Sequence, residues 1–355
     1  MLKSNDFNYI LPENYIAQTP ASPRDTAKLM VVNREQGTIT HKIFKDLSSL
    51  LGSRDVLVLN DSKVFPARLI GKKTSGGHAE VLLLRPVGID TWEAMSRGLK
   101  TPQIVSFTPK LTGHVLSKNT ETGFINIKFE SSENLDDLID KLGTTPIPPY
   151  IHTLLSESVL RREYQNVYAH QKGSAAAPTA GMHFTHELLQ TLQHKGIQIE
   201  RVTLHVGPGT FAKLRPEQIK SKTLHHEWYS IDQSTSDRLN LAKQQGKRIV
   251  AVGTTACRVL ESAASTTSTA SIIPHTSTTS LFIMPPYKFK FVDALITNFH
   301  LPESSLLMLV TAFISAPNAP HRFSTFPASL MGSAYQQAIQ HHYRFFSFGD
   351  AVLIC

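Results

Sequence analysis

Apolar and polar positions alternate along the chain in two different ways. Asp55-Val-Leu-Val-Leu-Asn60 is a continuous apolar run bounded by polar residues, which is typical of a strand buried on both faces of a parallel sheet. Further strands of this kind are predicted over 201–206, 248–253 and 292–297. Helical patterns stand between or after them, at His186–His194, Ser236–Gln245, Ala256–Ala263 and Ser305–Phe313. This alternation predicts an α/β domain with a mostly parallel sheet flanked by helices.

The pattern of apolar and polar residues changes over residues 67–148. Short β-rich runs recur here between turn residues, and Ile125, Ile127 and Phe129 alternate with polar neighbours, as in a half-buried strand. A helix is expected near Glu133–Leu142, followed by a stiff Pro-rich connection over 145–150. We therefore predict a small all-β barrel domain at 67–148, inserted into a discontinuous α/β catalytic domain made of 1–66 and 149–355. The β-rich runs are 79–84, 103–107 and 123–129.

Two stretches lack a periodic apolar face. The Ser/Thr-rich segment 262–280 and the Pro-rich segment 316–328 are expected to be surface loops. With 355 residues, two domains are the natural expectation, and no internal repeat is present.

Composition narrows the class of protein. The formal charge of +8 suits a polyanionic partner such as RNA, although a basic protein without such a partner has the same balance. The two cysteines, Cys257 and Cys355, are too few for a disulfide framework or a four-cysteine metal site. No run approaches the roughly 20 apolar residues of a membrane span, and the first residues lack the apolar core of a signal peptide. We expect a cytoplasmic protein.

Polar residues collect where four predicted strands end. Ligands of α/β sheets bind beyond the carboxyl ends of the strands, so these ends are candidate site positions. The four ends are Asn60-Asp61, His205 before the turn 207–210, Gly253-Thr-Thr255, and Asn298-Phe-His-Leu-Pro-Glu303.

The small-residue loop 173–184 also allows close approach of a ligand. The helix that follows Thr185 offers free N–H groups to a carboxylate or phosphate. Tight packing around a helix cap explains the same composition, and spacing alone favours that reading.

Several known kinds of site are absent from the sequence. It contains no dinucleotide-binding glycine fingerprint, no phosphate-binding P-loop and no H-E-x-x-H. The neighbouring His225-His-Glu227 and His341-His342 point in alternating directions, so we expect no metal site. Neither cysteine has an evident thiolate-stabilising neighbour.

Several long segments nevertheless resemble one family, in the family's order and across nearly the whole chain: the S-adenosylmethionine:tRNA ribosyltransferase-isomerases of queuosine biosynthesis. The resemblance rests on Asp55–Asp61 with Pro66–Leu69, Tyr164–Ala169, Ala176–Phe184, Val202–Phe211, Val252–Thr255, Ile296–Pro302 and Tyr343–Asp350. It implies transfer and isomerisation of the ribosyl part of S-adenosylmethionine onto the aminomethyl group of 7-aminomethyl-7-deazaguanine at the tRNA wobble position. The product would be epoxyqueuosine, with release of adenine and methionine. The resemblance also implies an α/β domain with a β-barrel insertion and no cofactor, because S-adenosylmethionine is consumed.

The chain departs from the family pattern at three positions. Lys222 stands where the family has His, Pro286 where it has Gly, and Lys63 where it has Arg. If the replaced His has a chemical role, His225 or His226 must supply it.

The implied reaction needs a base for a C5′ proton, an acid for departing adenine and a neutral substrate amine. Groups with a pKa near the working pH serve best, which favours His or a perturbed carboxylate. The candidate catalytic residues are Asp61, His183, His205 and His300. Each is equally well read as a hydrogen-bonded structural group. Substrate-binding candidates are Asn60, Arg68, Pro178, Thr179, Gly181, Thr254, Thr255, Arg258, Asn298 and Glu303.

Arg258 is expected to pair with the carboxylate of S-adenosylmethionine or with Glu261. Two rival functions remain open at this stage: an RNA methyltransferase, and a non-catalytic tRNA-binding module. The expected partners are tRNA and S-adenosylmethionine, and the expected state is a monomer.

Overall fold

The computed structural model describes residues 2–207, 214–265 and 271–355. Within these residues, nine strands form one sheet in the order β15-β13-β12-β3-β14-β16-β17-β1-β2. The strands are β1 Lys28–Asn33, β2 Thr38–Ile43, β3 Asp55–Asn60, β12 Gln198–Leu204, β13 Thr223–Ile231, β14 Arg248–Val252, β15 His275–Leu281, β16 Ala294–Asn298 and β17 Ala351–Ile354.

The centre of this sheet is parallel. β12, β3, β14 and β16 run side by side in one direction, while β13, β15, β17 and β2 each run antiparallel to a neighbour. The predicted α/β class is confirmed, and the sheet as a whole is mixed.

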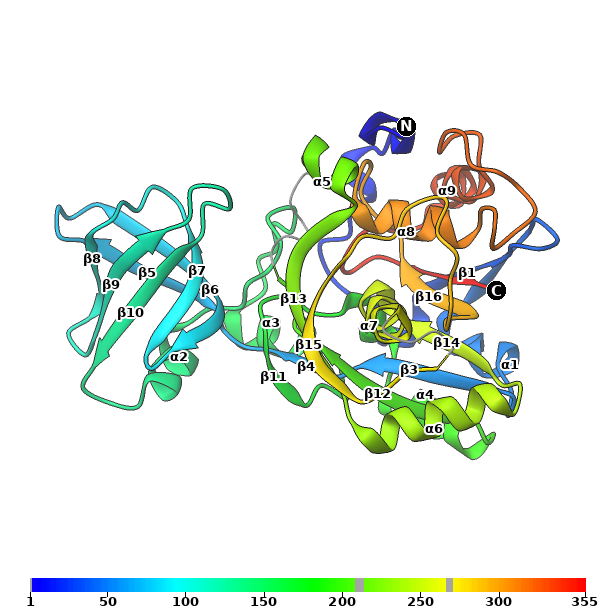
Figure 1. Cartoon of the computed structure of the whole chain (residues 1–355), viewed down its shortest axis with the longest axis horizontal. Coiled ribbons are helices and arrows are strands. Elements are labelled where there is room, and N and C mark those ends of the chain that lie inside the picture. The colour runs from blue at the N-terminus through cyan, green and yellow to red at the C-terminus, as the bar shows by residue number, and fades with distance from the viewer. Residues whose placement is uncertain (1, 208–213, 266–270) are drawn as a thin grey trace.

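Helices cover both faces of the sheet (Figure 1). In β3, Val56 and Val58 pack into one core and Leu57 and Leu59 into the other, which explains the continuous apolar run seen in the sequence. Helices α6–α9 contribute to the first core, and α1 and α4 to the second. The helices are α1 Leu47–Leu50, α2 Leu135–Leu142, α3 Glu157–Glu163, α4 His186–His194, α5 Pro216–Ser221, α6 Gln233–Gln244, α7 Gly253–Ser265, α8 Ser305–Phe313 and α9 Leu330–Gln340.

A second unit stands to one side of the α/β part (Figure 1). Six antiparallel strands close into a barrel in the order β10-β7-β6-β5-β8-β9, and side chains from these strands and α2 fill its core. The predicted barrel is therefore confirmed. All its strands lie within 67–148; the domain boundaries themselves stay a prediction. The strands are β5 Arg68–Lys73, β6 His78–Gly88, β7 Thr91–Ser96, β8 Gln103–Thr108, β9 Leu111–Lys118 and β10 Ile125–Ser131.

A short two-stranded ribbon lies where the barrel meets the sheet. β4 Ser62–Val64 pairs in parallel with β11 Gln171–Ser174, so the segment after β3 is tied to the segment before the loop 173–184. The segment that follows β3 and the start of the loop 173–184 are therefore held together at this ribbon.

The expectation of a surface loop over 262–280 is wrong in part. Residues up to 265 continue α7, and 275–281 form β15, which pairs with β13 at the sheet edge. A solvated edge strand does not need an apolar stripe, so its Ser/Thr-rich sequence gave no strand pattern. Residues 266–270 lie outside the described part of the chain. The segment 316–328 contains no helix or strand, as expected.

Candidate functional site

The four predicted strand ends lie together. β12, β3, β14 and β16 are consecutive parallel neighbours, so Leu204, Asn60, Val252 and Asn298 end at the same edge of the sheet. The four ends named from the sequence thus lie at one edge of the sheet, and their role as a ligand site stays a prediction. Parts of this edge are, however, covered by other segments of the chain.

The loop 173–184 covers the end of β16. Its last part is the 3-10 turn η5 (Thr179–His183), where the Thr179 hydroxyl donates to Asn298 Oδ1 at 2.9 Å. His183 Nε2 lies 3.1 Å from Asn298 Nδ2 and its ring packs on Phe44. Burial lowers the pKa of His183 to about 3, so the ring is neutral at pH 7.

Close packing holds this loop in place. A side chain at Gly181 would bring its Cβ to 1.9 Å from the Tyr168 hydroxyl. The Pro178 carbonyl accepts from Asn166 Nδ2 at 3.2 Å. The N-terminus of α4 is capped by Thr185, whose hydroxyl accepts from the Leu188 amide. These contacts support the reading of the loop as a packed helix cap.

Asn60 joins three elements. Its Nδ2 donates to the Leu204 carbonyl at 3.0 Å and to the Thr255 hydroxyl at 3.1 Å, and its Oδ1 accepts from the amides of Ser62 and Leu204. The whole side chain is buried. Thr254 beside it, in the first turn of α7, is buried as well. Asn60 and Thr255 thus fasten β3 to β12 and to α7.

Asp61 and His300 are also buried. Asp61 Oδ1 accepts from the Thr203 hydroxyl at 2.7 Å, and burial raises the pKa of its carboxyl. His300 Nε2 lies 3.0 Å from the Thr297 hydroxyl, and burial lowers the pKa of the ring to about 3.

Two further candidates lie at other places. Glu303 accepts from the Ser4 hydroxyl at 2.9 Å. Arg68 donates to the Ile147 carbonyl at 3.1 Å, at the root of the barrel.

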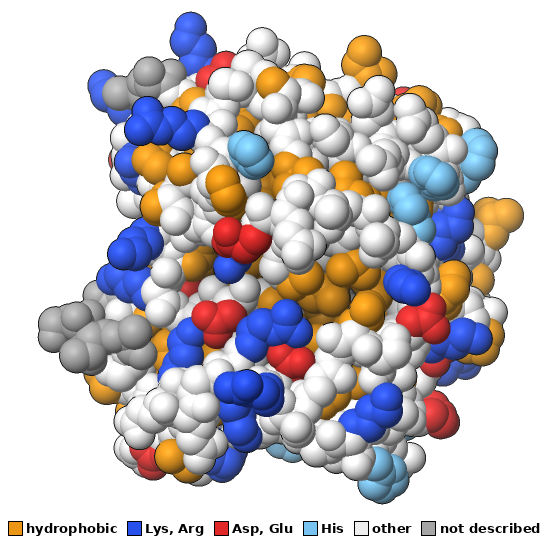
Figure 2. Space-filling view, turned by 90° about the vertical axis from the view of Figure 1, so that its right-hand side faces the viewer, with side chains coloured by type: hydrophobic (Ala, Val, Ile, Leu, Met, Phe, Trp, Pro, Cys, Tyr) orange, Lys and Arg blue, Asp and Glu red, His pale blue; other side chains and the backbone are white. Residues whose placement is uncertain are grey.

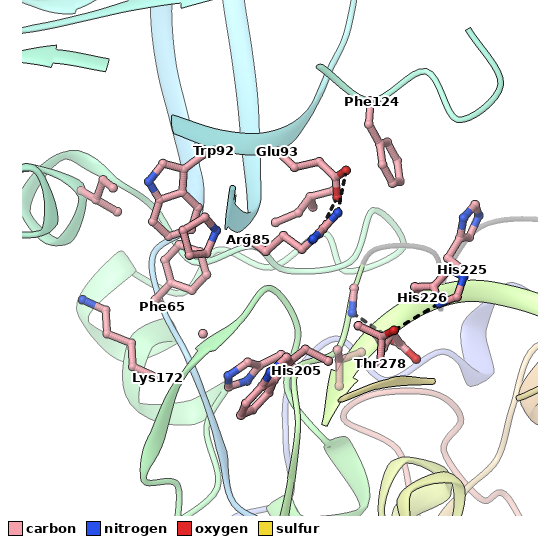
Figure 3. A pocket seen from close by; sticks show the side chains of 18 of the residues that line it. Phe65, Arg85, Trp92, Glu93, Phe124, Lys172, His205, His225, His226 and Thr278 are labelled. Atoms are coloured by element: carbon pink, nitrogen blue, oxygen red, sulfur yellow. Dashed lines mark hydrogen bonds and ion pairs between the residues drawn. The ribbon is translucent and has the colours of Figure 1, made fainter. Parts of the chain in front are cut away.

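A cleft of about 1010 Å³ separates the barrel from the α/β part (Figure 3). Of the candidates named from the sequence, His205 and Arg258 line this cleft. Sequence reasoning did not single out the barrel residues of its wall, although both tryptophans of the chain, Trp92 and Trp228, lie here. Other lining side chains are Phe65, Arg85, Glu93, Phe124, Asp136, Ile139, Lys172, Leu224, His225, His226, Glu227, Thr278 and Leu306.

His205 forms part of the floor of the cleft. Its ring stacks on Trp228, with centroids 4.7 Å apart and planes 17° from parallel. Burial lowers the pKa of His205 to about 4, so the imidazole is neutral at pH 7. Its Nδ1 has no hydrogen-bond partner among the described residues. A neutral imidazole that lines a cavity can act as a general base toward a ligand.

Arg258 and Glu227 form a buried ion pair on the cleft wall. The Arg258 Nε donates to the Leu281 carbonyl at 3.1 Å, and Glu227 Oε1 accepts from the Gly207 amide at 3.0 Å. The expected pairing of Arg258 with Glu261 is wrong. Glu261 instead accepts from the Tyr287 hydroxyl and from the backbone amides of residues 290–292.

The barrel supplies the opposite wall. Arg85 Nε and Glu93 Oε2 form an ion pair at 2.9 Å, and Trp92 lies against Phe65 with centroids 5.6 Å apart. Lys172 of β11 reaches Asp140 at 2.7 Å. Figure 3 shows Trp92 and Phe65 on one side of the opening and His205 on the other. A planar ring can therefore meet aromatic faces from both units.

The three departures from the family pattern lie on the surface. Lys222 ends α5 in a left-handed conformation with φ of 54°, and Lys63 and Pro286 are exposed. His225 and His226, which follow Lys222 on β13, both line the cleft. The turn 207–210 lies largely outside the described residues.

Among the described residues, no cluster of three or more His, Cys, Asp or Glu side chains is placed to hold a metal ion. No helix in the same part of the chain is long and apolar enough to span a membrane.

Comparison with known proteins agrees with this architecture. A family model described as queuosine biosynthesis protein matches residues 4–354. The chain is 43% identical to S-adenosylmethionine:tRNA ribosyltransferase-isomerase of Clostridioides difficile (strain 630), with 99% of this chain and 100% of that protein covered. It is 42% identical to the protein of the same name from Desulforamulus reducens, with the same coverage.

A solved structure is similar as well. The crystal structure of S-adenosylmethionine tRNA ribosyltransferase from Thermotoga maritima matches with a TM-score of 0.54 and 35% identity. The match covers 99% of this chain and 100% of that one. Fold, cleft and relatives together define an enzyme of the transferase and isomerase class. The chain belongs to the queuosine biosynthesis family of S-adenosylmethionine:tRNA ribosyltransferase-isomerases.

Proposed function

We propose that this enzyme transfers and isomerises the ribosyl moiety of S-adenosylmethionine onto the aminomethyl group of 7-aminomethyl-7-deazaguanine in tRNA. The product is epoxyqueuosine-tRNA, and adenine and methionine are released. The observation that carries the proposal is the similarity to proteins named for this activity, at 42–43% identity over 99% of the chain.

The cleft suits a nucleotide taken out of an RNA loop. Bases of single-stranded loops are commonly bound by stacking on aromatic side chains, and Trp92, Phe65 and the His205–Trp228 pair offer such faces. The net charge of +8 favours a polyanion. On the face away from the barrel, basic side chains are interspersed with acidic ones around an apolar hollow (Figure 2). We propose that tRNA docks across the opposite side, where barrel and α/β part meet.

His205 is the strongest catalytic candidate. It lines the cleft, its ring is neutral at pH 7, and its buried Nδ1 has no hydrogen-bond partner among the described residues. The protein therefore leaves one imidazole nitrogen unengaged, as proton removal from C5′ of S-adenosylmethionine requires. The adjacent sulfonium makes the C5′ proton more acidic. The base, here His205, must lie in contact with that proton. Asp61, His183 and His300 stay candidate catalytic residues, but their hydrogen bonds within the protein favour a role in holding the strand ends.

Several further expectations belong to this proposal. S-adenosylmethionine is consumed as a substrate, and we propose that the reaction uses no cofactor. We also propose that the enzyme is a cytoplasmic monomer.

Labelling tests the proposal directly. S-adenosylmethionine labelled in the ribose, incubated with tRNA bearing 7-aminomethyl-7-deazaguanine, should place label in the tRNA and release adenine and methionine in equal amounts. With methyl-labelled S-adenosylmethionine the tRNA should stay unlabelled. Methyl label in the tRNA, or S-adenosylhomocysteine as product, would establish a methyltransferase instead. Tight tRNA binding without any turnover would indicate a binding module.

A further inference from the structure

Strand β13 presents two different surfaces to the cleft. Successive side chains of a strand point to opposite faces, so Trp228, which stacks on His205, and Glu227, which meets Arg258 of α7, lie on opposite sides of the sheet edge. Both residues line the same cleft. The cleft therefore has an aromatic part, next to His205, and an ionic part, next to Arg258.

The ionic part contains unused hydrogen-bond donors. Arg258 is 5% exposed, and its Nη2 has no hydrogen-bond partner in the described residues, while Nε and Nη1 are held by Leu281 and Glu227. A buried donor without an acceptor is costly, so such a group in a native protein calls for a ligand or water. Its position is fixed before any ligand arrives.

The first turn of α8 adds donors to the same cleft. Ser304 caps this helix by accepting from the Leu307 amide, and Met308 bonds to the Ser304 carbonyl. Within the described chain, the amides of Ser305 and Leu306 have no acceptor, and both residues line the cleft. The start of a helix carries a partial positive charge that favours an anion.

The charges select the kind of ligand. Glu227 and Arg258 together are neutral, so an isolated anion would meet the Glu227 carboxylate and an isolated cation would meet the guanidinium and the helix start. A ligand end that carries both an ammonium and a carboxylate satisfies all of these groups without leaving a net buried charge. An α-amino acid has this arrangement.

We propose that Arg258, Glu227 and the first turn of α8 form the subsite for the amino-acid end of S-adenosylmethionine. The carboxylate accepts from Arg258 Nη2 and from the Ser305 and Leu306 amides, and the ammonium donates to Glu227. This assignment rests on the proposed function for the identity of the ligand. It leaves the aromatic part of the cleft, with His205, for the nucleoside portions of the two substrates.

Binding of altered ligands to the unmodified enzyme tests this assignment. We would measure the affinity for S-adenosylmethionine by calorimetry, and compare analogues that lack the carboxylate or the amino group. Loss of charge-assisted hydrogen bonds should weaken binding of each analogue by about 10- to 100-fold. If the enzyme binds S-adenosylmethionine but binds both analogues equally well, the subsite is wrong. If it neither binds S-adenosylmethionine nor transfers ribose, the proposed function itself fails.

Paired variants assign the individual contacts. Arg258→Gln should reduce the preference for the carboxylate and keep that for the amino group, and Glu227→Gln should reduce the preference for the amino group and keep that for the carboxylate. Arg238→Gln is the control, because Arg238 also forms an ion pair with a buried glutamate, Glu200, at 2.8 Å, and does not line the cleft. Variants that retain wild-type preferences would contradict the assignment. If a variant does not fold, the comparison of analogues on the unmodified enzyme still tests the assignment of the subsite.

Discussion

His205 and Trp228 stack face to face at the end of β12, with ring centroids 4.7 Å apart, and the His205 amide donates to the Trp228 carbonyl at 2.9 Å. Backbone pairing and ring stacking therefore fix the same imidazole. The ring, whose buried Nδ1 has no hydrogen-bond partner among the described residues, is thereby held in a defined orientation, as a general base requires.

His205→Ala should lower kcat by about 10²- to 10⁴-fold while leaving a folded protein, because a proton-transfer group is lost and the backbone bond stays. Single-turnover ribosyl transfer and circular dichroism measure the two effects. His194→Ala, which changes an exposed histidine of α4, serves as control. A folded His205→Ala enzyme with near-normal rate would show that the residue is structural.

Gly173→Ala should displace the His205 imidazole. Gly173 has φ of +146°, and a Cβ built there would come within 2.6 Å of His205 Nε2. Displacing a reacting group by about 1 Å can cost about 10²-fold in rate, so we expect kcat to fall toward the His205→Ala value. Gly52→Ala is the control, since its added Cβ would meet no atom within 4 Å. Equal rates for the two variants would contradict this coupling.

Buried neutral histidines should make the enzyme acid-sensitive. His183 and His300 have pKa values of about 3 in the folded protein, against about 6.5 in the unfolded chain. The unfolded state therefore takes up protons first, and the free energy of unfolding should fall as the pH drops below about 6.5. Each histidine contributes a slope of up to about 1.4 kcal/mol per pH unit.

Urea unfolding at pH 7.5 and pH 5.5 measures this slope. His300→Gln should have a smaller difference in the free energy of unfolding between the two pH values than the unmodified protein. An unchanged slope in His300→Gln would mean that this ring is protonated in the folded state.

Binding of tRNA should weaken steeply with salt, because phosphate contacts release counterions. With 6–10 such contacts, affinity should drop by about 10³- to 10⁵-fold between about 50 and 200 mM salt. S-adenosylmethionine binding, which lacks phosphate contacts, should change little over this range. Lys63→Gln should reduce the salt slope by about one, since Lys63 is exposed beside Lys172 on the β4–β11 ribbon. A flat salt dependence would exclude this docking mode.

Much of the fold could be predicted because its central elements have strong local patterns. The apolar run of β3, and helices α4 and α8, have the bounds expected from the sequence. β15 was missed because its pairing with β13 depends on a partner about 50 residues away and not on its own composition.

The site could be predicted only in part for a similar reason. Parallel neighbours place the ends of β12, β3, β14 and β16 together, which strand order determines. Which of these ends open to a ligand depends on the loop 173–184, whose contact between Thr179 and Asn298 spans 119 residues. The barrel wall with Trp92 could not be foreseen, because nothing local in the sequence of β7 says that it faces the sheet.

The position of β17 in the sheet has a consequence for folding of the chain during translation. Its four buried residues, Ala351–Ile354, lie between β16 and β1, and they are the contact that joins the β1–β2 hairpin to the rest of the sheet. A ribosome makes that hairpin before the other strands of the sheet and β17 after them, so the hairpin must wait for nearly all of the chain to be translated. Until then its apolar side chains, such as Met30 and Val32, have no complete sheet to pack into. Nascent chains stalled before β17 should therefore be bound by chaperones and sensitive to proteases.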